Sequence, residues 1–388
     1  MNLTDRIDAA AAALESQVIA WRRDLHQHPE LGNREFRTAS IVAEHLRSLG
    51  FDEVKTGVAH TGVVGLLKGG KPGGVVALRA DMDGLPVTEA VDLPFASKAR
   101  AVWNGEEVGV MHACGHDCHV AILMGVASIL AGLRERIPGS VKFIFQPAEE
   151  MPPEGEEGGA ALMIKEGVLE HPTPSAIFGL HVTSRQPVGV IGYRPGPTMA
   201  SSDRLKITVR GKQTHGAAPW LGVDPIVTSA QIVLGLQTIV SRTLDLNREP
   251  AVVTIGAIRG GVRENIIPDA VEMRGTIRSF DEGMRDDIHA RVTQLAEGIA
   301  TASRASCQVC ITKNYPVTHN DPALTEAMLP TLTRVASTGP RPMGIEVVPK
   351  VTGAPEFDTN RRKCLIRIGW PFGIATTAGS VGCRWSVS

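Results

Sequence analysis

The sequence predicts an α/β protein in which a doubly wound domain is interrupted by an inserted ferredoxin-like α+β domain. Three observations lead to this fold class. A length of 388 residues calls for two or three domains rather than one. Helical and strand-like stretches alternate up to about residue 185, as a doubly wound sheet requires. Beyond residue 198 the stretches follow the order β-α-β-β-α-β, which is the ferredoxin-like order.

The first domain is expected to comprise residues 1–185 and 317–388. Its N-terminal segment predicts a capped amphipathic helix, because Asp5, Asp8 and Glu15 interrupt the apolar core that a signal peptide would need. A second helix is predicted from residue 35 to Gly50, where the glycine ends it. Two β-rich runs, 63–67 and 75–78, are joined by a Gly-rich turn signal and predict a hairpin.

The rest of this domain is predicted to alternate in the same way. A helix from about residue 120, a strand at 141–145, a helix near 160–165 and a strand at 176–182 follow one another. Polar motifs come directly after the strands. Because open α/β sheets bind ligands beyond the carboxyl ends of their strands, we expect the functional residues to gather there.

The inserted domain is expected to cover residues 186–316, beginning at a Gly- and Pro-rich stretch and ending at Tyr315-Pro316. Its predicted elements are a strand at 205–209, a helix at 224–241, strands at 252–258 and 270–277, a helix at 281–299 and a strand at 307–311. Cys307 and Cys310 stand three apart in the last strand and therefore point to opposite faces. This spacing favours packing over a redox pair.

Composition limits the classes of partner. Lys and Arg number 40 against 41 Asp and Glu, so the chain lacks the excess of positive charge that nucleic acid binding needs. The apolar stretches 119–133 and 225–241 contain polar residues and are too short to span a membrane, so they predict core helices. We expect neither nucleic acid nor a membrane as partner. Six Cys, two of them in one His-rich octapeptide, indicate a reducing compartment, and we expect a cytoplasmic protein.

The octapeptide at residues 112–119 is richer in metal-ligand types than any other stretch, with three His, two Cys and one Asp. A glycine between Cys114 and His116 lets both side chains point the same way, toward a divalent metal that binds thiolate and imidazole at about 2.0–2.3 Å. A polar turn entering a helix would explain a single His better than it explains the whole group. Cys118 and His119 are expected to pack, and Asp117 to orient an imidazole or cap the helix.

Two adjacent carboxylates, Glu149 and Glu150, follow the strand at 141–145. If one of them binds a metal, its neighbour can serve as general base toward a bound water and then pass the proton to a leaving amine. A solvated acidic loop is the alternative for this motif in isolation. His181 ends the next predicted strand, so it is expected at the same edge of the sheet.

Taken together, these motifs resemble the metal-dependent amidohydrolases that include hippurate hydrolases, N-acyl-amino-acid aminoacylases and plant auxin-conjugate hydrolases, which are relatives of the two-zinc carboxypeptidases. The similar segments are 21–31, 79–86, 111–117, 146–150 and 179–182, within a resemblance that covers about residues 15–357. The resemblance implies two divalent metal ions, which are zinc, manganese, nickel or cobalt. It implies a metal-binding catalytic domain whose ligands are Cys114, His116, Glu150 and His181, with Glu149 as the base. Asp81 and Asp83 occupy a His-x-Asp position of the wider carboxypeptidase group, and we expect them to support ligands.

The inserted segments 211–219, 265–269 and 275–278 resemble the dimerisation and lid domain of the same family. There, the equivalents of His215, Asn265 and Arg278 hold the substrate carboxylate and carbonyl, and the His often reaches across a dimer. Such donors suit an oxyanion and a free carboxylate. Turn roles for His215 and Asn265, and an exposed strand charge for Arg278, are the alternatives. The resemblance implies a homodimer or a higher homo-oligomer.

The sequence departs from the family near its C-terminal end. The family carries Gly-Ser/Ala-Glu-Asp-Phe and then a His-x-Pro segment whose His closes the metal site. This chain has Gly-Ala-Pro-Glu-Phe at 353–357, and no His follows His319. The atypical tail, 359–388, reflects either a shifted reading frame or truncation, or genuine divergence. Trp220, where the family often has His, is a milder departure. We expect one metal to be held more weakly than the other and turnover to be impaired.

The leading functional hypothesis is hydrolysis of the amide bond of small, hippurate-like N-acyl amino acids. A metal-activated water would attack the carbonyl, with Glu149 carrying the proton. A dipeptidase or a succinyl-diaminopimelate-type deacylase is the alternative among enzymes. A catalytically impaired binding protein that keeps the dimeric fold is the alternative outside them, and the absent C-terminal His is its support.

Overall fold

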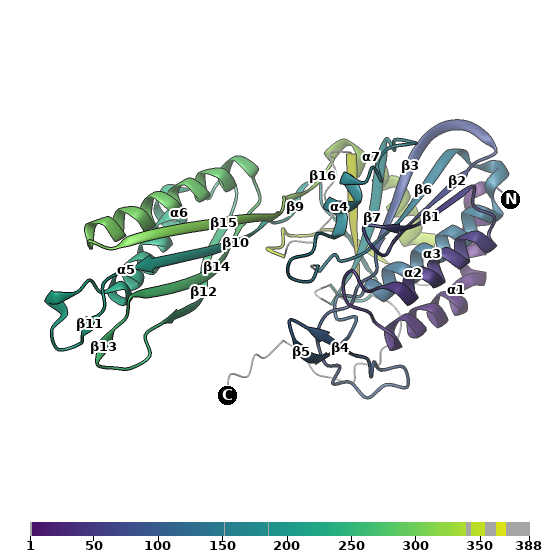
Figure 1. Ribbon diagram of the computed structural model, residues 1–388. Coiled ribbons are helices and arrows are strands. Elements are labelled where there is room, and N and C mark those ends of the chain that lie inside the picture. The colour runs from purple at the N-terminus through teal and green to yellow at the C-terminus, as the bar shows by residue number, and fades with distance from the viewer. Residues whose placement is uncertain (1, 151, 185, 339–342, 354–361, 370–388) are drawn as a thin grey trace.

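The computed structural model describes residues 2–150, 152–184, 186–338, 343–353 and 362–369, the last range for its backbone alone. Two units are joined by a narrow connection (Figure 1). One unit is built on a mixed sheet with strand order β1-β2-β6-β3-β7-β18-β8-β17, and the other on a sheet with order β12-β14-β10-β15. This arrangement confirms the predicted fold class, a doubly wound domain with an inserted ferredoxin-like domain.

Three helices cover one face of the large sheet. These are α1 (Leu3–Gln27), α2 (Phe36–Ser48) and α3 (His116–Gly132). Helix α1 begins at a capping box, in which the Asn2 side chain accepts a hydrogen bond from the Asp5 N–H at 2.9 Å. Leu46 of α2, Met124 of α3 and Phe143 of the sheet are buried in one apolar cluster. Removing this surface from water holds the helices against the sheet.

The predicted hairpin between residues 63–67 and 75–78 is wrong. Strands β2 (Gly62–Lys68) and β3 (Lys71–Asp81) are separated by β6 (Pro138–Gln146), and β2 pairs on its other side with β1 (Glu53–Val58). The glycines between β2 and β3 do not form a tight turn; they allow this segment to pass close to the backbone at Gly139. Gly69 N donates to Gly139 O at 2.8 Å, and a Cβ on Gly139 would lie 1.9 Å from Gly74 O.

The other face of the large sheet is covered by α4 (Gly159–Lys165) and α7 (Pro322–Thr338). Strand β7 (Ala176–Thr183) runs parallel to β3, which runs parallel to β6. Their carboxyl ends therefore meet at one edge of the sheet, where the sequence predicted the functional residues. Within the ranges that the structure describes, no helix has the length and apolar character needed to cross a membrane.

The predicted domain boundary at residue 186 does not agree with the sheets. Strand β8 (Val190–Tyr193) lies in the large sheet beside β17 (Gly344–Val347) and β18 (Arg362–Gly369), and β9 (Gly196–Met199) pairs with β16 (Thr318–Asn320). The short apolar run at 190–193 satisfies its backbone in the sheet despite its Gly- and Pro-rich surroundings. We therefore propose boundaries for the inserted domain near residues 201 and 316.

The inserted domain follows the predicted β-α-β-β-α-β order, and all its strand pairs are antiparallel. Its core packs Leu236, Ile277 and Val292 between the helices and the sheet. Cys307 packs against this core while Cys310 is exposed, which confirms that they point to opposite faces. The main elements are β10 (Ser202–Arg210), α5 (Pro225–Thr238), β12 (Ala251–Gly260), β14 (Ala270–Ser279), α6 (Glu282–Ala302) and β15 (Ser306–Tyr315).

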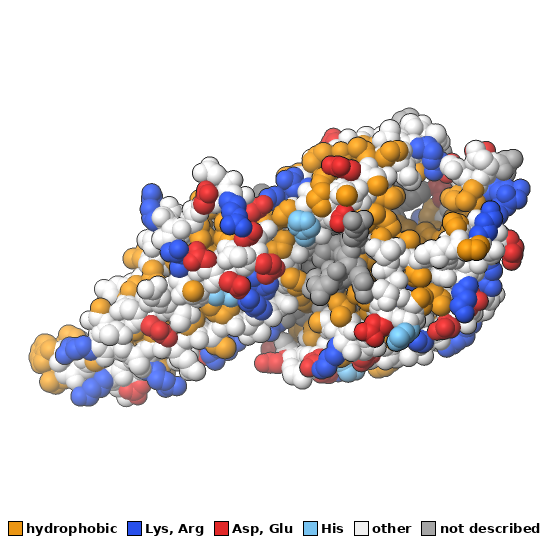
Figure 2. Space-filling view, turned by 90° about the horizontal axis from the view of Figure 1, so that it is seen from above, with side chains coloured by type: hydrophobic (Ala, Val, Ile, Leu, Met, Phe, Trp, Pro, Cys, Tyr) orange, Lys and Arg blue, Asp and Glu red, His pale blue; other side chains and the backbone are white. Residues whose placement is uncertain are grey.

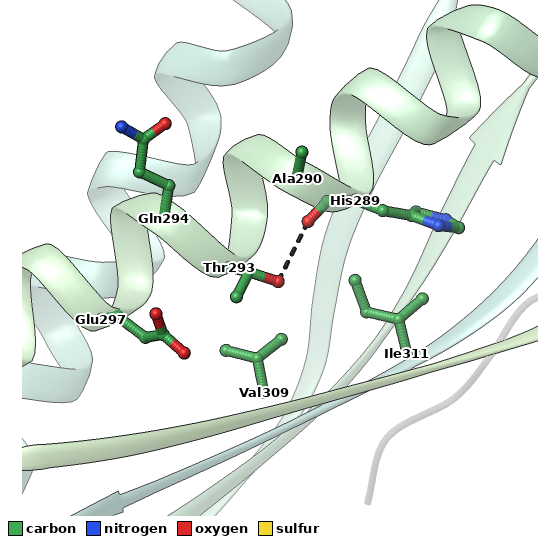
Figure 3. Close-up of a pocket in the computed structure, with 7 residues that line it drawn as sticks. All are labelled: His289, Ala290, Thr293, Gln294, Glu297, Val309 and Ile311. Atoms are coloured by element: carbon green, nitrogen blue, oxygen red, sulfur yellow. Dashed lines mark hydrogen bonds between the residues drawn. The ribbon is translucent and has the colours of Figure 1, made fainter.

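Short elements complete the described chain. They are β4 (Arg100–Trp103), β5 (Glu106–Gly109), β11 (Thr214–His215), β13 (Ile266–Ile267), the 3₁₀ helices η1 (Arg134–Arg136) and η2 (Pro219–Leu221), and a π-helical turn η3 (Ile239–Thr243) that extends α5. A groove of about 550 Å³ lies between α6 and β15, lined among others by His289, Glu297 and Val309 (Figure 3). It lies on the inserted domain, away from the strand ends of the large sheet.

Candidate metal centre and active site

The start of α3 places two of the predicted ligands beside the strand ends. Gly115 adopts a left-handed conformation with φ of 86° and forms the N-cap of α3, so Cys114 and His116 flank a sharp turn. A Cβ at Gly115 would come within 2.3 Å of Val182 Cγ2, next to His181 on β7. Glycine is therefore required here both for its backbone conformation and for close approach to the neighbouring strand.

The four predicted ligands meet at this edge. Ligand atoms of Cys114, His116 and Glu150 lie within 4.8 Å of one another. The Cys114 Sγ lies 3.4 Å from His181 Nε2. Glu149, the predicted base, adjoins the same group, because its Oε2 is 3.6 Å from His116 Nε2. The group combines a thiolate donor, two imidazoles and two carboxylates, the donor types that a divalent transition metal prefers.

Both imidazoles present Nε2 to the group. His116 Nδ1 lies 3.1 Å from Asp83 Oδ1 and His181 Nδ1 lies 2.5 Å from the Val182 carbonyl oxygen, so Nδ1 of each ring can donate a proton to an oxygen. The buried Nε2 of His116 has no hydrogen-bond partner among the described residues. A buried nitrogen lone pair that faces a thiol and a carboxylate fits a metal ion, and the oxygen partners fix its tautomer.

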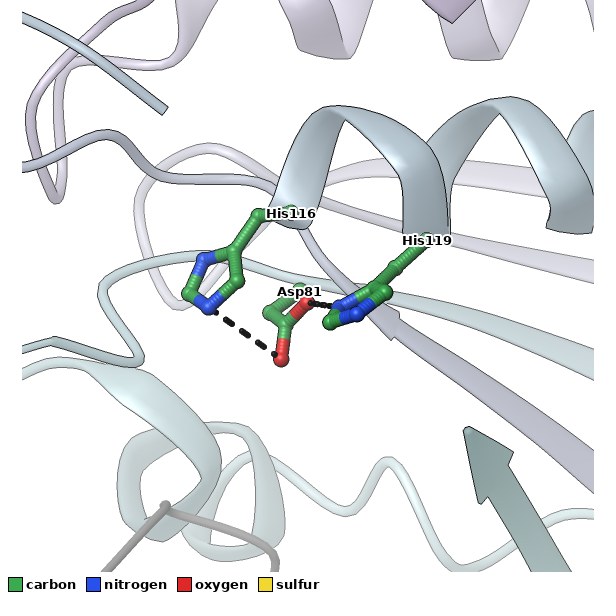
Figure 4. A group of neighbouring side chains, drawn as sticks. All are labelled: Asp81, His116 and His119. Atoms are coloured by element: carbon green, nitrogen blue, oxygen red, sulfur yellow. Dashed lines mark hydrogen bonds and ion pairs between the residues drawn. The ribbon is translucent and has the colours of Figure 1, made fainter. Parts of the chain in front are cut away.

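Asp81 lies between His116 and His119, both on α3 (Figure 4). Its Oδ1 is 2.5 Å from His119 Nδ1, and its Oδ2 accepts a hydrogen bond from Arg79 at 2.5 Å. His119 Nε2 accepts a hydrogen bond from the Val182 N–H at 3.0 Å. Both nitrogens of His119 are thus engaged, and the ring links the strand end of β3 to that of β7. Although Asp81, His116 and His119 lie close enough to hold a metal, His119 has no lone pair to offer one.

Asp117, the second residue of α3, contacts α1. It lies 2.9 Å from His26 Nδ1 and 2.8 Å from Arg22 Nε. Burial opposes its charge, but the hydrogen bond from His26 and the nearby positive charges hold the pKa of Asp117 well below its usual range. Asp117 therefore orients an imidazole, one of the two roles considered for it, and it does so for a histidine of the first helix.

Burial opposes charge in this group. At His116 the carboxylates of Asp81 and Asp83 outweigh burial and raise the pKa of the imidazole. At the other ligands and at Glu149, burial has the larger effect. It raises the pKa of Cys114 to about 12 and that of Glu149 to about 8, and it lowers the pKa of His181 to about 3. It also raises the pKa of Glu150. Only about 4% of the Glu149 surface is exposed, which is incompatible with a solvated acidic loop. A bound cation would favour the thiolate and the carboxylates.

The turn that carries Glu149 and Glu150 is held by side chains from elsewhere. Ala148, in a left-handed conformation, donates its N–H to Glu35 Oε1 at 2.8 Å. Glu150 donates its N–H to Asp83 Oδ2 at 2.9 Å, and the Tyr315 hydroxyl donates to the Glu149 carbonyl oxygen at 3.1 Å. Sequence reasoning missed Glu35 and Tyr315, because neither stands in a motif with metal-ligand types.

The predicted substrate-binding residues of the inserted domain lie apart from this group. His215 is exposed on β11, which pairs with β13 at the end of the inserted domain remote from α3 (Figure 1). Asn265 directly precedes β13, and its buried Oδ1 has no hydrogen-bond partner among the described residues. Arg278 is half-buried at the end of β14 that faces the first domain. One chain therefore does not bring His215 to Glu149.

The sequence departure at 353–357 lies outside the described residues except for Gly353, and so does the tail 359–388 apart from the backbone of β18. Strand β18 lies next to β7, the strand that carries His181, and runs parallel to it.

Comparisons with known proteins agree with this geometry. The family model of peptidase family M20/M25/M40 matches residues 77–379. Thermostable carboxypeptidase 2 of Saccharolobus solfataricus is 40% identical over 385 residues, which are 99% of this chain and 92% of the relative. N-acyl-L-amino acid amidohydrolase of Geobacillus stearothermophilus is 42% identical over 309 residues, 79% of each chain. The structure of Bacillus subtilis YXEP protein, a dinuclear metal binding peptidase from the M20 family, matches with a TM-score of 0.77 at 34% identity, covering 93% of this chain and 90% of that one.

Proposed function

The chain belongs to peptidase family M20/M25/M40, and we propose that within this family of hydrolases it cleaves the amide bond of small N-acyl amino acids with two divalent metal ions as cofactors. The observation that carries the proposal is the convergence of Cys114, His116 and Glu150 within 4.8 Å beside the buried carboxyl of Glu149. These donors come from the turn that begins α3 and from the segment after β6, which only the fold brings together.

In the proposed mechanism, Cys114, His116, Glu150 and His181 hold the metal ions. When bound, such ions act as Lewis acids that polarise a carbonyl and make water a stronger nucleophile. The Oε2 atom of Glu149 lies 3.6 Å from His116 Nε2, so its carboxylate adjoins the proposed ligands. It takes a proton from the attacking water and returns it to the nitrogen of the leaving amino acid.

Two features support an N-acyl amino acid as substrate. The relative from Geobacillus stearothermophilus is named for that class of substrate and is 42% identical over 309 residues. In addition, Arg278 stands on the side of the inserted domain that faces the first domain, where a guanidinium can pair with a free carboxylate. We further propose that the acyl group of the substrate is hippurate-like.

A dimer is part of the proposal, because His215 of one chain does not reach its own catalytic group. Hydrophobic side chains gather at the end of the inserted domain (Figure 2). Exposed apolar residues on η2, α5 and β12 are Trp220, Leu221, Ile226, Val227, Leu234 and Ile258. A second copy packed on this surface would bury it and would carry a second His215 and Asn265 across the assembly. Sedimentation of the purified chain tests this, and a monomer would contradict it.

A second candidate function is cleavage of a peptide bond at a carboxyl terminus. It is favoured by 40% identity to a thermostable carboxypeptidase over 99% of this chain. One assay separates the candidates. Purified protein is incubated with hippurate, N-acetyl amino acids, succinyl-diaminopimelate and dipeptides, with manganese, zinc, nickel or cobalt added, and release of free amine is measured.

Chelator-sensitive release from N-acyl amino acids supports the proposal, and release from peptides alone supports the second candidate. No release from any substrate, with the protein folded and loaded with metal, supports an impaired binding protein. Metal analysis after dialysis addresses the missing C-terminal His. We expect one ion per chain to be retained and the other to be lost, and two retained ions would contradict this expectation.

A further inference from the structure

The tyrosine that ends β15 reaches from the inserted domain to the turn that carries Glu149. Tyr315 is the last residue of that strand, and its hydroxyl donates to the Glu149 carbonyl oxygen at 3.1 Å, across 166 residues of sequence. We propose that Tyr315 is a positioning residue that couples the placement of Glu149 to the orientation of the inserted domain. This inference rests on the proposed function, because it assumes that Glu149 is the base.

The turn contains a strained backbone conformation that side chains from other segments hold in place. Ala148 has a positive φ of 47°, a conformation that costs a non-glycine residue free energy unless the surroundings impose it. Glu35 and Asp83 hold the N–H groups on either side of Glu149, and both belong to the first domain. Tyr315 holds the carbonyl oxygen of Glu149 itself. Of these three side chains, it alone comes from the inserted domain.

The strand that carries Tyr315 is fixed firmly within its own domain. Two residues before Tyr315, Lys313 pairs with Asp203 in the ladder between β15 and β10. Asp203 is buried and accepts hydrogen bonds from Arg285 at 2.5 Å and from His289 at 2.7 Å, both on α6. The inserted sheet and α6 therefore move as one body at this point, and a rotation of the domain displaces the Tyr315 hydroxyl with it.

The functional consequence follows from what the hydroxyl touches. It donates to the backbone carbonyl oxygen of Glu149, the residue whose side chain is the proposed base. Its loss leaves the ligands, the carboxyl of Glu149 and the hydrogen bonds to Glu35 and Asp83 in place, but removes the hydrogen bond to the carbonyl oxygen of Glu149. A base that is present but less well placed lowers the rate of the chemical step, while substrate and metal binding stay nearly unchanged.

The chain has only two tyrosines, which provides a matched control. Tyr315→Phe and Tyr193→Phe each remove one hydroxyl, and Tyr193 packs in the cluster of Ile191, Leu332 and Ala336, on the face of the sheet that α7 covers. Each protein is loaded with metal and assayed on the N-acyl amino acid that the wild type cleaves fastest. For Tyr315→Phe we expect kcat to fall about five- to tenfold, the effect of one hydrogen bond, with KM within about twofold. Tyr193→Phe should match the wild type.

A spectroscopic readout isolates the coupling to domain orientation. In the Tyr193→Phe protein, 3-fluorotyrosine labels position 315 alone, so the fluorine spectrum contains one protein resonance. We expect this resonance to shift when the metal-loaded enzyme binds its amino acid product, because closure of the inserted domain on a ligand changes the contact with Glu149. A resonance that does not respond to saturating product would overturn the coupling.

The outcomes separate this inference from the proposed function. If Tyr315→Phe keeps the wild-type kcat while Glu149→Gln is inactive, the base assignment stands and the role of Tyr315 is overturned. If Tyr315→Phe loses metal or melts lower in proportion to its lost activity, its role is structural and the inference is likewise overturned. If Glu149→Gln retains full activity, the proposed mechanism itself fails, whatever Tyr315→Phe does.

Discussion

Two buried groups of charged side chains, one in each domain, differ in whether the chain satisfies their polar atoms. In the inserted domain, the carboxylate of Asp203 meets the guanidinium of Arg285 and the imidazole of His289, so charge and hydrogen bonds are matched. In the first domain, acids gather around His116, whose buried Nε2 has no hydrogen-bond partner among the described residues. The matched group stabilises the fold, whereas the unmatched group is suited to a cation and a substrate.

The largest effect is expected from Glu149→Gln, which keeps the shape of the side chain and removes its ability to accept a proton. We expect kcat to fall by about 10²- to 10⁴-fold, the usual contribution of a general base, with metal content unchanged. Steady-state rates and metal analysis measure both. Glu154→Gln, an exposed carboxylate in the following loop, is the control. Equal activity of the two variants would show that Glu149 is not the base.

The matched group can be broken by Arg285→Met. This change leaves Asp203 buried without its guanidinium, and breaking a buried pair in this way costs about 3–5 kcal/mol of unfolding free energy. Denaturant unfolding followed by circular dichroism measures the loss. Arg274→Met, which removes an exposed guanidinium paired with Glu272 on β14, should cost less than about 1 kcal/mol. Similar costs for both variants would mean that the two ion pairs are energetically equivalent.

The contrast between the two groups also shows how far sequence reasoning reaches. Cys114, His116 and the Glu149-Glu150 pair were identifiable because ligand types stand close together in the sequence or at strand ends. Helical and strand periods likewise predicted the ferredoxin-like order correctly. Both the ligand motifs and the periodicity involve residues close together in the sequence, so they can be recognised without knowledge of the fold.

What the sequence did not predict depends on contacts between distant segments. The Gly-rich connection of β2 and β3 looks like a turn, and only the insertion of β6 between them shows that its glycines allow backbones to cross. Glu35 reaches Ala148 from 113 residues away, and Asp203 meets Arg285 from 82 residues away. No period or motif marks such pairs. His215 shows the same limit beyond one chain, because its proposed site requires a second copy.

Beside the unmatched group, Glu35 should make the free energy of unfolding depend on pH. Burial and the charge of Asp83 raise the pKa of Glu35 to about 8, above its value in the unfolded chain. The folded protein therefore holds the proton of Glu35 more tightly than the unfolded chain does. This stabilising effect is complete below about pH 4.5 and is lost as the pH rises toward 8. Glu35→Gln resembles the protonated form and should lose stability less steeply over this range, gaining on the order of 2 kcal/mol relative to the wild type.

Urea unfolding of chelator-treated protein at pH 5 and pH 8 measures this difference. Glu44→Gln, an exposed carboxylate on the same helix α2, controls for the loss of a charge. If the stability curves of Glu35→Gln and the wild type stay parallel between these pH values, Glu35 is ionised throughout and the hydrogen bonds from Thr61 and Ala148 outweigh its burial.

The smallest effect is expected within the matched group, from His289→Ala. This substitution removes one of the hydrogen bonds to Asp203 but leaves Arg285 paired with it, so no unpaired buried charge is created. The cost should be about 1 kcal/mol, well below that of Arg285→Met, and it should appear in the same denaturant assay. His289→Gln retains an N–H donor and should recover part of the loss. If His289→Ala costs as much as Arg285→Met, the imidazole and the guanidinium hold Asp203 equally, and the ranking of these two contacts is wrong.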